Sequence, residues 1–110
     1  MYKIVACDLD ETLLSDDRTI SKENIEAIQK AKELGVKFVP ATGRGFNTVD
    51  GTLKDLGLYD LENEYVISYN GGAITENKGS KLLHFEGISF EKARELYKRG
   101  LDYDVCIHVY

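Results

Sequence analysis

Several features that define whole classes of protein are missing from this sequence. Its longest apolar runs have the length of a strand, far short of the roughly 20 residues that a membrane-spanning helix needs. Residues 1–3 lead straight into such a run, without the pattern of a signal peptide. Acidic residues outnumber basic ones by 19 to 14, the net charge is −5, and no basic patch stands out. We therefore expect no membrane and no nucleic acid among the partners, and a cytoplasmic location.

Cysteine is scarce, and repeats and low-complexity segments are absent. Cys7 and Cys106 are isolated, with neither the Cys-x-x-Cys nor the Cys/His spacing of a zinc site. We interpret both as free thiols that serve as small core residues in strands. The chain has 110 residues, of which 43% are hydrophobic and 30% charged, so it is long enough for one small domain and too short for two.

Short apolar runs and helix-like periodicity predict a β-α-β-α-β order, and hence an α/β fold, for the first two thirds of the chain. The expected strands cover residues 3–7, 36–39 and 65–68, and the expected helices run from Ser21 to Gly35 and from Phe46 to Gly57. The first run is apolar without alternation, which favours a parallel strand covered on both faces. Right-handed crossovers would place the three strands in one parallel sheet, so that the loops after them meet at one edge.

The pattern changes after Gly72. Residues 73–75 and 81–85 flank a polar loop and predict a hairpin, and a third helix begins after Ser89 and ends at Gly100. Residues 104–110 alternate between apolar and other side chains, as a strand does. The chain stops inside this expected strand, so we expect a truncated chain.

Two carboxylates follow the end of the first expected strand. Asp8 and Asp10 are separated only by Leu9, and in strand geometry residues i and i+2 lie on one face. Like charges at this spacing suit either a divalent cation or separate nucleophile and acid/base roles. Mg²⁺ prefers such oxygen ligands, together with water and substrate phosphate. The alternative interpretation is a solvated acidic turn that also includes Glu11.

A small anion site is expected after the second strand. The Thr42 hydroxyl, a glycine without Cβ at Gly43 and the N-terminus of a helix can together hold a phosphate oxygen. Arg44 either reaches the same phosphate or lies in solvent. The turn that begins at Asn70 follows the third strand, so we expect Asp8, Thr42 and Asn70 to be neighbours. Taken alone, Thr42-Gly43 is also compatible with an ordinary turn and helix cap.

These residues resemble the motifs of the haloacid dehalogenase (HAD) superfamily of phosphotransferases. Asp8-Leu9-Asp10-Glu11-Thr12 is similar to the first motif, Asp-x-Asp-x-Thr, in which Gly is commonest at position 11. Thr42-Gly43-Arg44 is similar to the second motif, in which a hydroxyl and the next backbone N–H hold a phosphate oxygen. With Asn70-Gly71-Gly72 and the hairpin and helix that follow, the chain looks like the N-terminal portion of the Cof-type branch, whose members dephosphorylate small metabolites.

The resemblance implies a fold and a mechanism. Residues 1–72 would form the first half of a Rossmann-like, three-layer core with a parallel sheet, and residues 73–110 would begin an α+β cap domain. Asp8 would attack phosphorus to form an aspartyl phosphate, and Asp10 would act as general acid and base. Mg²⁺ would be held by the Asp8 carboxylate and the Asp10 main-chain carbonyl, and the phosphate of a small metabolite by Thr42, Gly43, Arg44 and Asn70.

Two further motifs of this superfamily, a lysine and an acidic pair on later strands, have no counterpart in the sequence. We therefore expect very weak activity or none. The first strand, central in the family's sheet, would be left as an apolar edge, and we expect self-association there. The alternative function is a non-catalytic remnant that binds Mg²⁺ or phosphate or acts only through self-association.

Two other folds fit the sequence less well. Gly43-Arg44-Gly45 follows a strand as in dinucleotide-binding domains, but Thr48 stands where the third glycine is needed. A receiver-type signalling domain needs an aspartate at the end of the third strand, and Asn70 occupies that neighbourhood.

Overall fold

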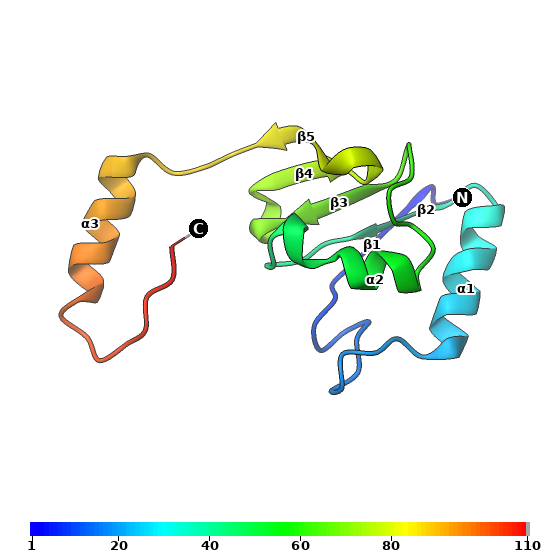
Figure 1. The fold of residues 1–110 in the computed structure, drawn as a ribbon, viewed down its shortest axis with the longest axis horizontal. Coiled ribbons are helices and arrows are strands. Elements are labelled where there is room, and N and C mark those ends of the chain that lie inside the picture. The colour runs from blue at the N-terminus through cyan, green and yellow to red at the C-terminus, as the bar shows by residue number, and fades with distance from the viewer. Residues whose placement is uncertain (110) are drawn as a thin grey trace.

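Five short strands and three α-helices make up the computed structural model, which describes residues 1–109 (Figure 1). In chain order they are β1 (Ile4–Cys7), α1 (Lys22–Glu33), β2 (Lys37–Pro40), α2 (Asp50–Asp55), β3 (Tyr65–Ser68), β4 (Ala73–Glu76), β5 (Lys81–Phe85) and α3 (Phe90–Gly100). Short 3-10 turns precede α2, join β3 to β4 and join β4 to β5. The fold class is therefore α/β, as expected.

The strands form a two-stranded parallel sheet and a three-stranded antiparallel sheet, joined by one parallel bridge, and not the single continuous parallel sheet that we expected. β1 pairs with β2 in parallel, and a single parallel bridge between Ala41 and Ile67 continues from the end of β2 to β3. β3, β4 and β5 then pair antiparallel, which confirms the predicted hairpin. The parallel β1–β2 pair follows from the α1 crossover, because parallel neighbours need such a connection.

Helix α1 has the ends that its sequence predicts. The Ser21 hydroxyl accepts a hydrogen bond from the Asn24 N–H at 3.2 Å, and Gly35 after the helix has a φ of 79°, in the left-handed region that favours glycine. Ile28 is buried. α3 starts in the same way, because the Ser89 hydroxyl accepts from the Lys92 N–H at 3.2 Å.

The second helix is shorter than predicted. The Thr48 N–H and hydroxyl both donate to the Gly45 carbonyl, at 2.9 and 2.8 Å, and close a separate tight turn. Val49 then has a non-helical ψ of 4° and is buried in the core, so regular helix begins only at Asp50. The N-terminus of α2 consequently lies seven residues beyond Gly43 and is not part of the expected anion site.

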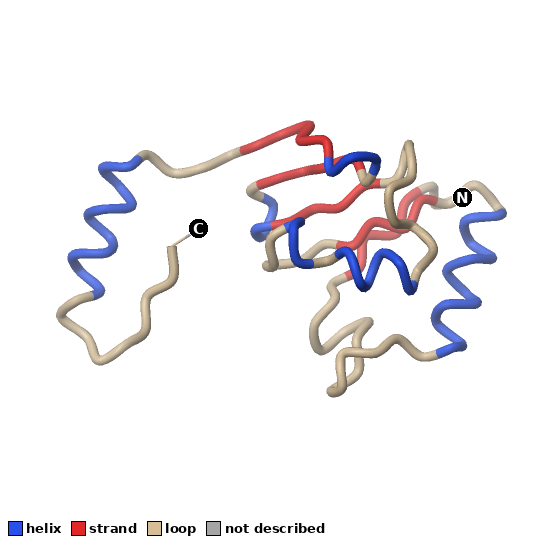
Figure 2. The backbone as a smooth tube through the Cα atoms, viewed as in Figure 1, coloured by secondary structure: helices blue, strands red, loops and turns tan. Residues whose placement is uncertain are grey.

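The strand expected at residues 104–110 is wrong over the part that the structure describes. Residues 104–109 have no strand conformation, and Tyr110 lies outside the described residues. No described strand lies beside them to pair with, and the segment turns back toward α3, where Ile107 fills the space beside Gly100. Figure 2 shows this return as loop. Val105 and Val109 remain exposed.

The hydrophobic core lies between the sheet and helices α1 and α2. Its most deeply buried side chains come from the segment after β1, from the region of α2 and from β3, and are Leu9, Val49, Leu56, Leu58 and Val66. β1 itself is exposed at Ile4 and Val5, so the expected cover on both faces is absent among the described residues. Cys7 is half-buried, whereas Cys106 is exposed and is not the core residue that we expected.

Helix α3 projects from this packed part at the end of an extended segment (Figure 1). The radius of gyration is 16.4 Å, against about 13 Å for a compact chain of this length. β4 buries Ala73 and Thr75, whereas β5 and α3 bury no residue. The division between core and cap at residue 72 remains a prediction. Over residues 1–109, no helix is both long enough and apolar enough to cross a membrane.

Candidate functional site

The segment that follows β2 is hydrogen-bonded to the C-terminal ends of β1 and β3. The Ala41 N–H donates to the Cys7 carbonyl at 2.8 Å, and the Thr42 N–H donates to the Ile67 carbonyl at 2.9 Å. The ends of β1, β2 and β3 therefore meet at one edge of the sheet, as predicted. In α/β proteins this is the edge where ligands bind.

The two carboxylates lie in the turn after β1, not in the strand itself. Leu9 is fully buried in the core, whereas Asp8 and Asp10 on either side of it are exposed. The expected alternation is thus kept beyond the end of the strand, because Leu9 anchors the turn. The Thr12 hydroxyl donates to one oxygen of Asp8 at 3.2 Å, which holds that carboxylate in place.

The anion loop, residues Thr42–Gly45, faces the carboxylates. Thr42 is buried, and its hydroxyl accepts a hydrogen bond from the Arg44 N–H at 3.1 Å. The Arg44 guanidinium lies 3.9 Å from the Asp10 carboxylate and also donates to the Thr48 carbonyl. Arg44 therefore links the anion loop to the carboxylate pair and is not a free surface side chain. Sequence analysis did not identify Thr48 as its partner, although the spacing of four residues allows this contact.

Asn70 lies against the anion loop from the turn after β3. Its N–H donates to the Thr42 carbonyl at 3.1 Å, and its side-chain oxygen would lie 2.9 Å from a Cβ placed on Gly43. Only glycine fits at position 43 without displacing this amide. Thr42 and Asn70 are thus neighbours, as expected, and Arg44 connects both to the turn that carries Asp8 and Asp10.

The donor set fits one kind of metal site. Two exposed carboxylates, Asp8 and Asp10, provide oxygen ligands, and within residues 1–109 no group of three or more His, Cys, Asp or Glu side chains could hold a metal ion. Mg²⁺ commonly binds through one or two carboxylates and takes its other ligands from substrate phosphate and water. The residues present therefore suit a Mg²⁺ ion shared with a phosphorylated ligand.

Cys7 immediately precedes Asp8 in the chain. Its thiol donates to the Asp8 carbonyl at 3.3 Å. Burial raises the pKa of the Cys7 thiol, and the negative charge of Asp8 raises it further. The thiol therefore stays protonated at neutral pH and does not compete with Asp8 as a nucleophile.

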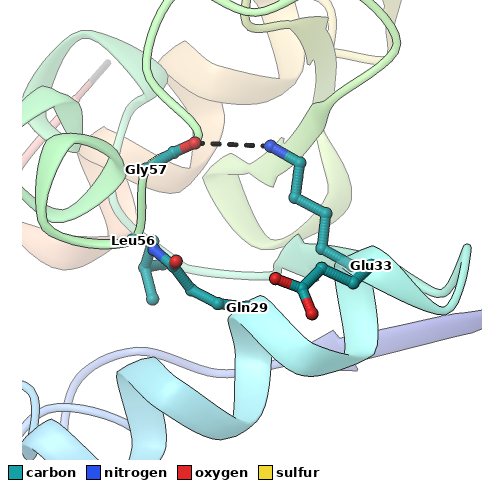
Figure 3. A pocket seen from close by; sticks show the side chains of 5 residues that line it. Gln29, Glu33, Leu56 and Gly57 are labelled. Atoms are coloured by element: carbon teal, nitrogen blue, oxygen red, sulfur yellow. Dashed lines mark hydrogen bonds between the residues drawn. The ribbon is translucent and has the colours of Figure 1, made fainter.

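Two of the cavities in the described part of the chain differ in their relation to the site. One of about 700 Å³ opens beside Gly43 and Asn70 and reaches the apolar side chains of α3, including Leu96 and Tyr97. The other, of about 370 Å³, lies between α1 and the end of α2, where the Lys32 ammonium donates to the Gly57 carbonyl (Figure 3). None of the predicted site residues lines the second cavity, so only the first belongs to the candidate site.

Comparison with known proteins agrees with the geometry. Residues 5–110 match the family of haloacid dehalogenase-like hydrolases. The Bacillus subtilis protein YxeH is 33% identical over 110 residues, which are all of this chain and 40% of the relative. The 5-amino-6-(5-phospho-D-ribitylamino)uracil phosphatase YcsE of the same organism is 37% identical over 90 residues, which are 78% of this chain and 34% of the relative.

A solved structure has the same fold. The structure of a haloacid dehalogenase-like hydrolase from B. subtilis aligns with a TM-score of 0.78 and 32% identity, covering 91% of this chain and 33% of that chain. The chain thus spans two fifths or less of each of these three proteins. Since the family match extends over nearly all of its residues, the chain belongs to the haloacid dehalogenase-like hydrolases.

Proposed function

We propose that this chain carries the nucleophile and the phosphate-binding loop of a Mg²⁺-dependent phosphatase that acts on small phosphorylated metabolites. The observation that carries the proposal is the 3.9 Å approach of Arg44 to Asp10, which brings an anion-binding loop against a carboxylate pair. The Arg44 guanidinium is a donor that suits a phosphate dianion, and Mg²⁺ would offset the repulsion between the phosphate and the carboxylates. The name of the relative YcsE, a phosphatase for a phosphorylated ribityl compound, supports this class of substrate.

In the proposed reaction, Asp8 is the nucleophile. The Thr12 hydroxyl holds one of its carboxylate oxygens, at 3.2 Å, and the other oxygen attacks phosphorus. The bond from phosphorus to the leaving oxygen breaks, and Asp10 gives that oxygen a proton. Asp10 then takes a proton from a water molecule, which attacks the aspartyl phosphate and releases inorganic phosphate. Mg²⁺ held by the Asp8 carboxylate and the Asp10 main-chain carbonyl would offset negative charge on the phosphoryl group.

Thr42, Gly43, Arg44 and Asn70 bind the phosphate in this proposal. The leaving group extends into the cavity of about 700 Å³ beside Gly43 and Asn70. We propose that turnover by these 110 residues alone is very weak, because they hold no counterpart of the family's later lysine and acidic pair. The two free thiols of Cys7 and Cys106 are typical of a reducing compartment, which supports a cytoplasmic location for this activity.

A second candidate function is self-association without catalysis. It is favoured by the exposed apolar side chains of β1, where Ile4 is 62% and Val5 43% exposed. A strand with an unpaired edge and apolar side chains can pair with another chain.

Hydrolysis of p-nitrophenyl phosphate tests the first proposal. We expect slow, Mg²⁺-dependent release of p-nitrophenol that EDTA abolishes and that Asp8→Asn lowers by at least about a hundredfold. Asp16→Asn is the matched control, since Asp16 is an exposed aspartate outside the site, and it should keep the activity of the unsubstituted chain. Equal activity in the Asp8→Asn and Asp16→Asn variants would contradict the mechanism. No activity in any of the three proteins would favour the second candidate.

A further inference from the structure

The turn after β3 has an unusual backbone. Tyr69 and Asn70 have φ values of 49° and 55°, and Gly71 follows with 92°. Two adjacent residues with side chains in the left-handed region are unfavourable, and such conformations persist only where their surroundings hold them. In this turn the surroundings that hold the backbone include the anion loop.

The backbone of the turn is fixed to the anion loop at two points. The Tyr69 N–H donates to the Arg44 carbonyl at 3.0 Å, and the Asn70 N–H donates to the Thr42 carbonyl at 3.1 Å. The Gly72 N–H closes the turn on the Tyr69 carbonyl at 3.0 Å. The left-handed conformation is what allows consecutive N–H groups to reach alternate carbonyls of the loop.

The side chains of the turn occupy the space beside the two glycines of the loop. A Cβ placed on Gly45 would lie 2.6 Å from the Tyr69 hydroxyl oxygen and 2.7 Å from the Asn47 side-chain oxygen, just as one on Gly43 would meet the Asn70 amide. The Tyr69 ring also contacts Phe46 edge to face, with centroids 6.0 Å apart and an interplanar angle of 85°. Arg44 is thus flanked by two glycines, each covered by a side chain from the turn.

We propose that Tyr69 is a positioning residue, which holds the anion loop in its binding conformation before a ligand arrives. The inference rests on the proposed function, because it concerns the loop that would bind phosphate. Glycines on both sides of Arg44 leave its backbone intrinsically free. The Tyr69 ring removes that freedom at Gly45, and Arg44 is thereby kept 3.9 Å from Asp10. A preformed loop has less ordering to undergo on binding, so Tyr69 acts on the affinity for phosphate and not on the chemical step.

Amide hydrogen exchange at Arg44 tests this directly, because the Arg44 N–H is held by the Thr42 hydroxyl at 3.1 Å. In Tyr69→Ala we expect this amide to exchange about tenfold faster or more, while amides of α1 are unchanged. Tyr69→Phe keeps the ring and its edge-to-face contact with Phe46, so its effect should be smaller than that of Tyr69→Ala. Tyr59→Ala is the matched control, since Tyr59 lies against Lys54, outside the site, and it should leave the Arg44 amide unaffected.

Binding of inorganic phosphate in the presence of Mg²⁺, followed by ³¹P NMR, gives the functional readout. We expect Tyr69→Ala to weaken binding about tenfold, and in any preparation with turnover to raise KM with kcat within about twofold. Gly45→Ala disturbs the same contact from the other side. A Cβ at Gly45 would also meet the Asn47 side-chain oxygen, so the effects of Gly45→Ala and Tyr69→Ala should be less than additive in the double variant without cancelling completely.

The possible outcomes separate the inference from the function on which it rests. An unchanged Arg44 exchange rate in Tyr69→Ala, or equal effects of Tyr69→Ala and Tyr69→Phe, would overturn the positioning role alone. Additive effects of Gly45→Ala and Tyr69→Ala would do the same. If the unsubstituted chain binds no phosphate with Mg²⁺, the proposed function fails, and the positioning role fails with it.

Discussion

Glu11 occupies a backbone position that favours glycine, between the two residues Asp10 and Thr12 of the candidate site. Its φ is 61°, in the left-handed region. A side chain there costs roughly 1–2 kcal/mol, whereas glycine adopts this conformation freely. The family resemblance had already marked position 11 as one where Gly is commonest, and the structure supplies the physical reason.

We therefore expect Glu11→Gly to raise the free energy of unfolding by about 0.5–1 kcal/mol, the relief of strain being partly offset by greater freedom of the unfolded chain. The midpoint of urea denaturation at constant slope measures it. Glu26→Gly, in the interior of α1, is the matched control and should lower stability by about 1 kcal/mol. A destabilised Glu11→Gly variant would show that the Glu11 side chain makes a contribution larger than its strain.

The raised pKa of the Cys7 thiol predicts how the stability of the fold and the reactivity of this thiol depend on pH. Burial, and then the charge of Asp8, raise its pKa, so folding favours the neutral thiol. The corresponding stabilisation is present below the pKa of the unfolded chain and is lost as pH rises through the higher folded value. Because the thiolate is the reactive form, Cys7 should be alkylated by iodoacetamide more slowly than the exposed Cys106 at pH 8.

Mass spectrometry of the alkylated peptides compares the two rates. Asp8→Asn removes the charge that is the second cause of the shift, so it should speed alkylation of Cys7 while leaving Cys106 unchanged. Faster alkylation of Cys7 than of Cys106 in the unsubstituted chain would contradict the raised pKa.

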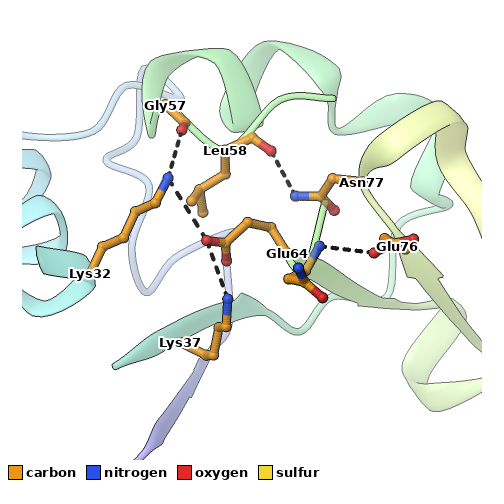
Figure 4. A network of polar contacts seen from close by, with 8 residues as sticks. Lys32, Lys37, Gly57, Leu58, Glu64, Glu76 and Asn77 are labelled. Carbon is orange, nitrogen blue, oxygen red and sulfur yellow. Dashed lines mark hydrogen bonds and ion pairs between the residues drawn. The ribbon is translucent and has the colours of Figure 1, made fainter. Parts of the chain in front are cut away.

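At the scale of the elements, a buried carboxylate ties α1, β2 and β3 together at the ends of the strands remote from the site (Figure 4). Glu64, just before β3, is 5% exposed and lies 3.8 Å from the Lys32 ammonium and 3.7 Å from that of Lys37. Its carbonyl accepts from the Asn77 N–H at 2.8 Å. One negative charge thus lies between two positive ones contributed by different elements.

Removing that charge leaves the two lysines to repel each other. We expect Glu64→Gln to lower the free energy of unfolding by about 1–3 kcal/mol, less than a fully buried pair would lose because both lysines are partly exposed. Urea denaturation measures the loss, and added salt should reduce it. Glu62→Gln, an exposed neighbour, is the matched control and should change stability by less than about 0.5 kcal/mol. Equal stability of the two variants would contradict the network.

The elements also show what the sequence can and cannot predict. Ser21, Ser89 and Gly35 identify helix ends correctly, because capping is a local interaction that depends on residue type. Residues 104–109 alternate as a strand does, yet they form none, because alternation without a partner strand leaves the backbone unpaired. The tight turn that Thr48 closes on Gly45, and that shortens the second helix, has no sequence signal that we recognised.

In the candidate site, too, some features could be predicted from the sequence and others could not. Asp8, Thr42 and Asn70 were predicted as neighbours, because topology brings the ends of parallel strands to one edge. The contact of Arg44 with Asp10 and the cover of Gly45 by Tyr69 depend on side-chain conformations and on left-handed backbone at Tyr69. Spacing along the chain does not encode either of them.

At the scale of the whole molecule, the two outer strands of the described sheet differ in how open they are to another chain. β5 contains Lys81 and His84, and a register shift interrupts its pairing with β4. Charges and irregular pairing of this kind protect a sheet edge. β1 has the uncharged sequence Ile-Val-Ala-Cys and pairs regularly with β2. Pairing between chains should therefore occur through β1.

We expect the chain to self-associate through β1, with two copies related by a twofold axis so that their β1 edges pair antiparallel. Sedimentation equilibrium should then show an average mass that rises with protein concentration. Val5→Lys places a charge in the middle of β1, where Val5 is 43% exposed, and should shift the chain to monomer. Leu83→Lys makes the same change in β5, where Leu83 is 47% exposed, and should leave association unchanged.

The pair of variants separates edge pairing from non-specific association through exposed apolar side chains. If Leu83→Lys abolishes association as well as Val5→Lys does, the apolar surface of β5 and α3 is responsible, and the edge of β1 is not. A chain that remains monomeric at high concentration would contradict both explanations, and with them the second candidate function. Association that only Val5→Lys removes would show that the unpaired edge of β1 determines how this chain behaves in solution.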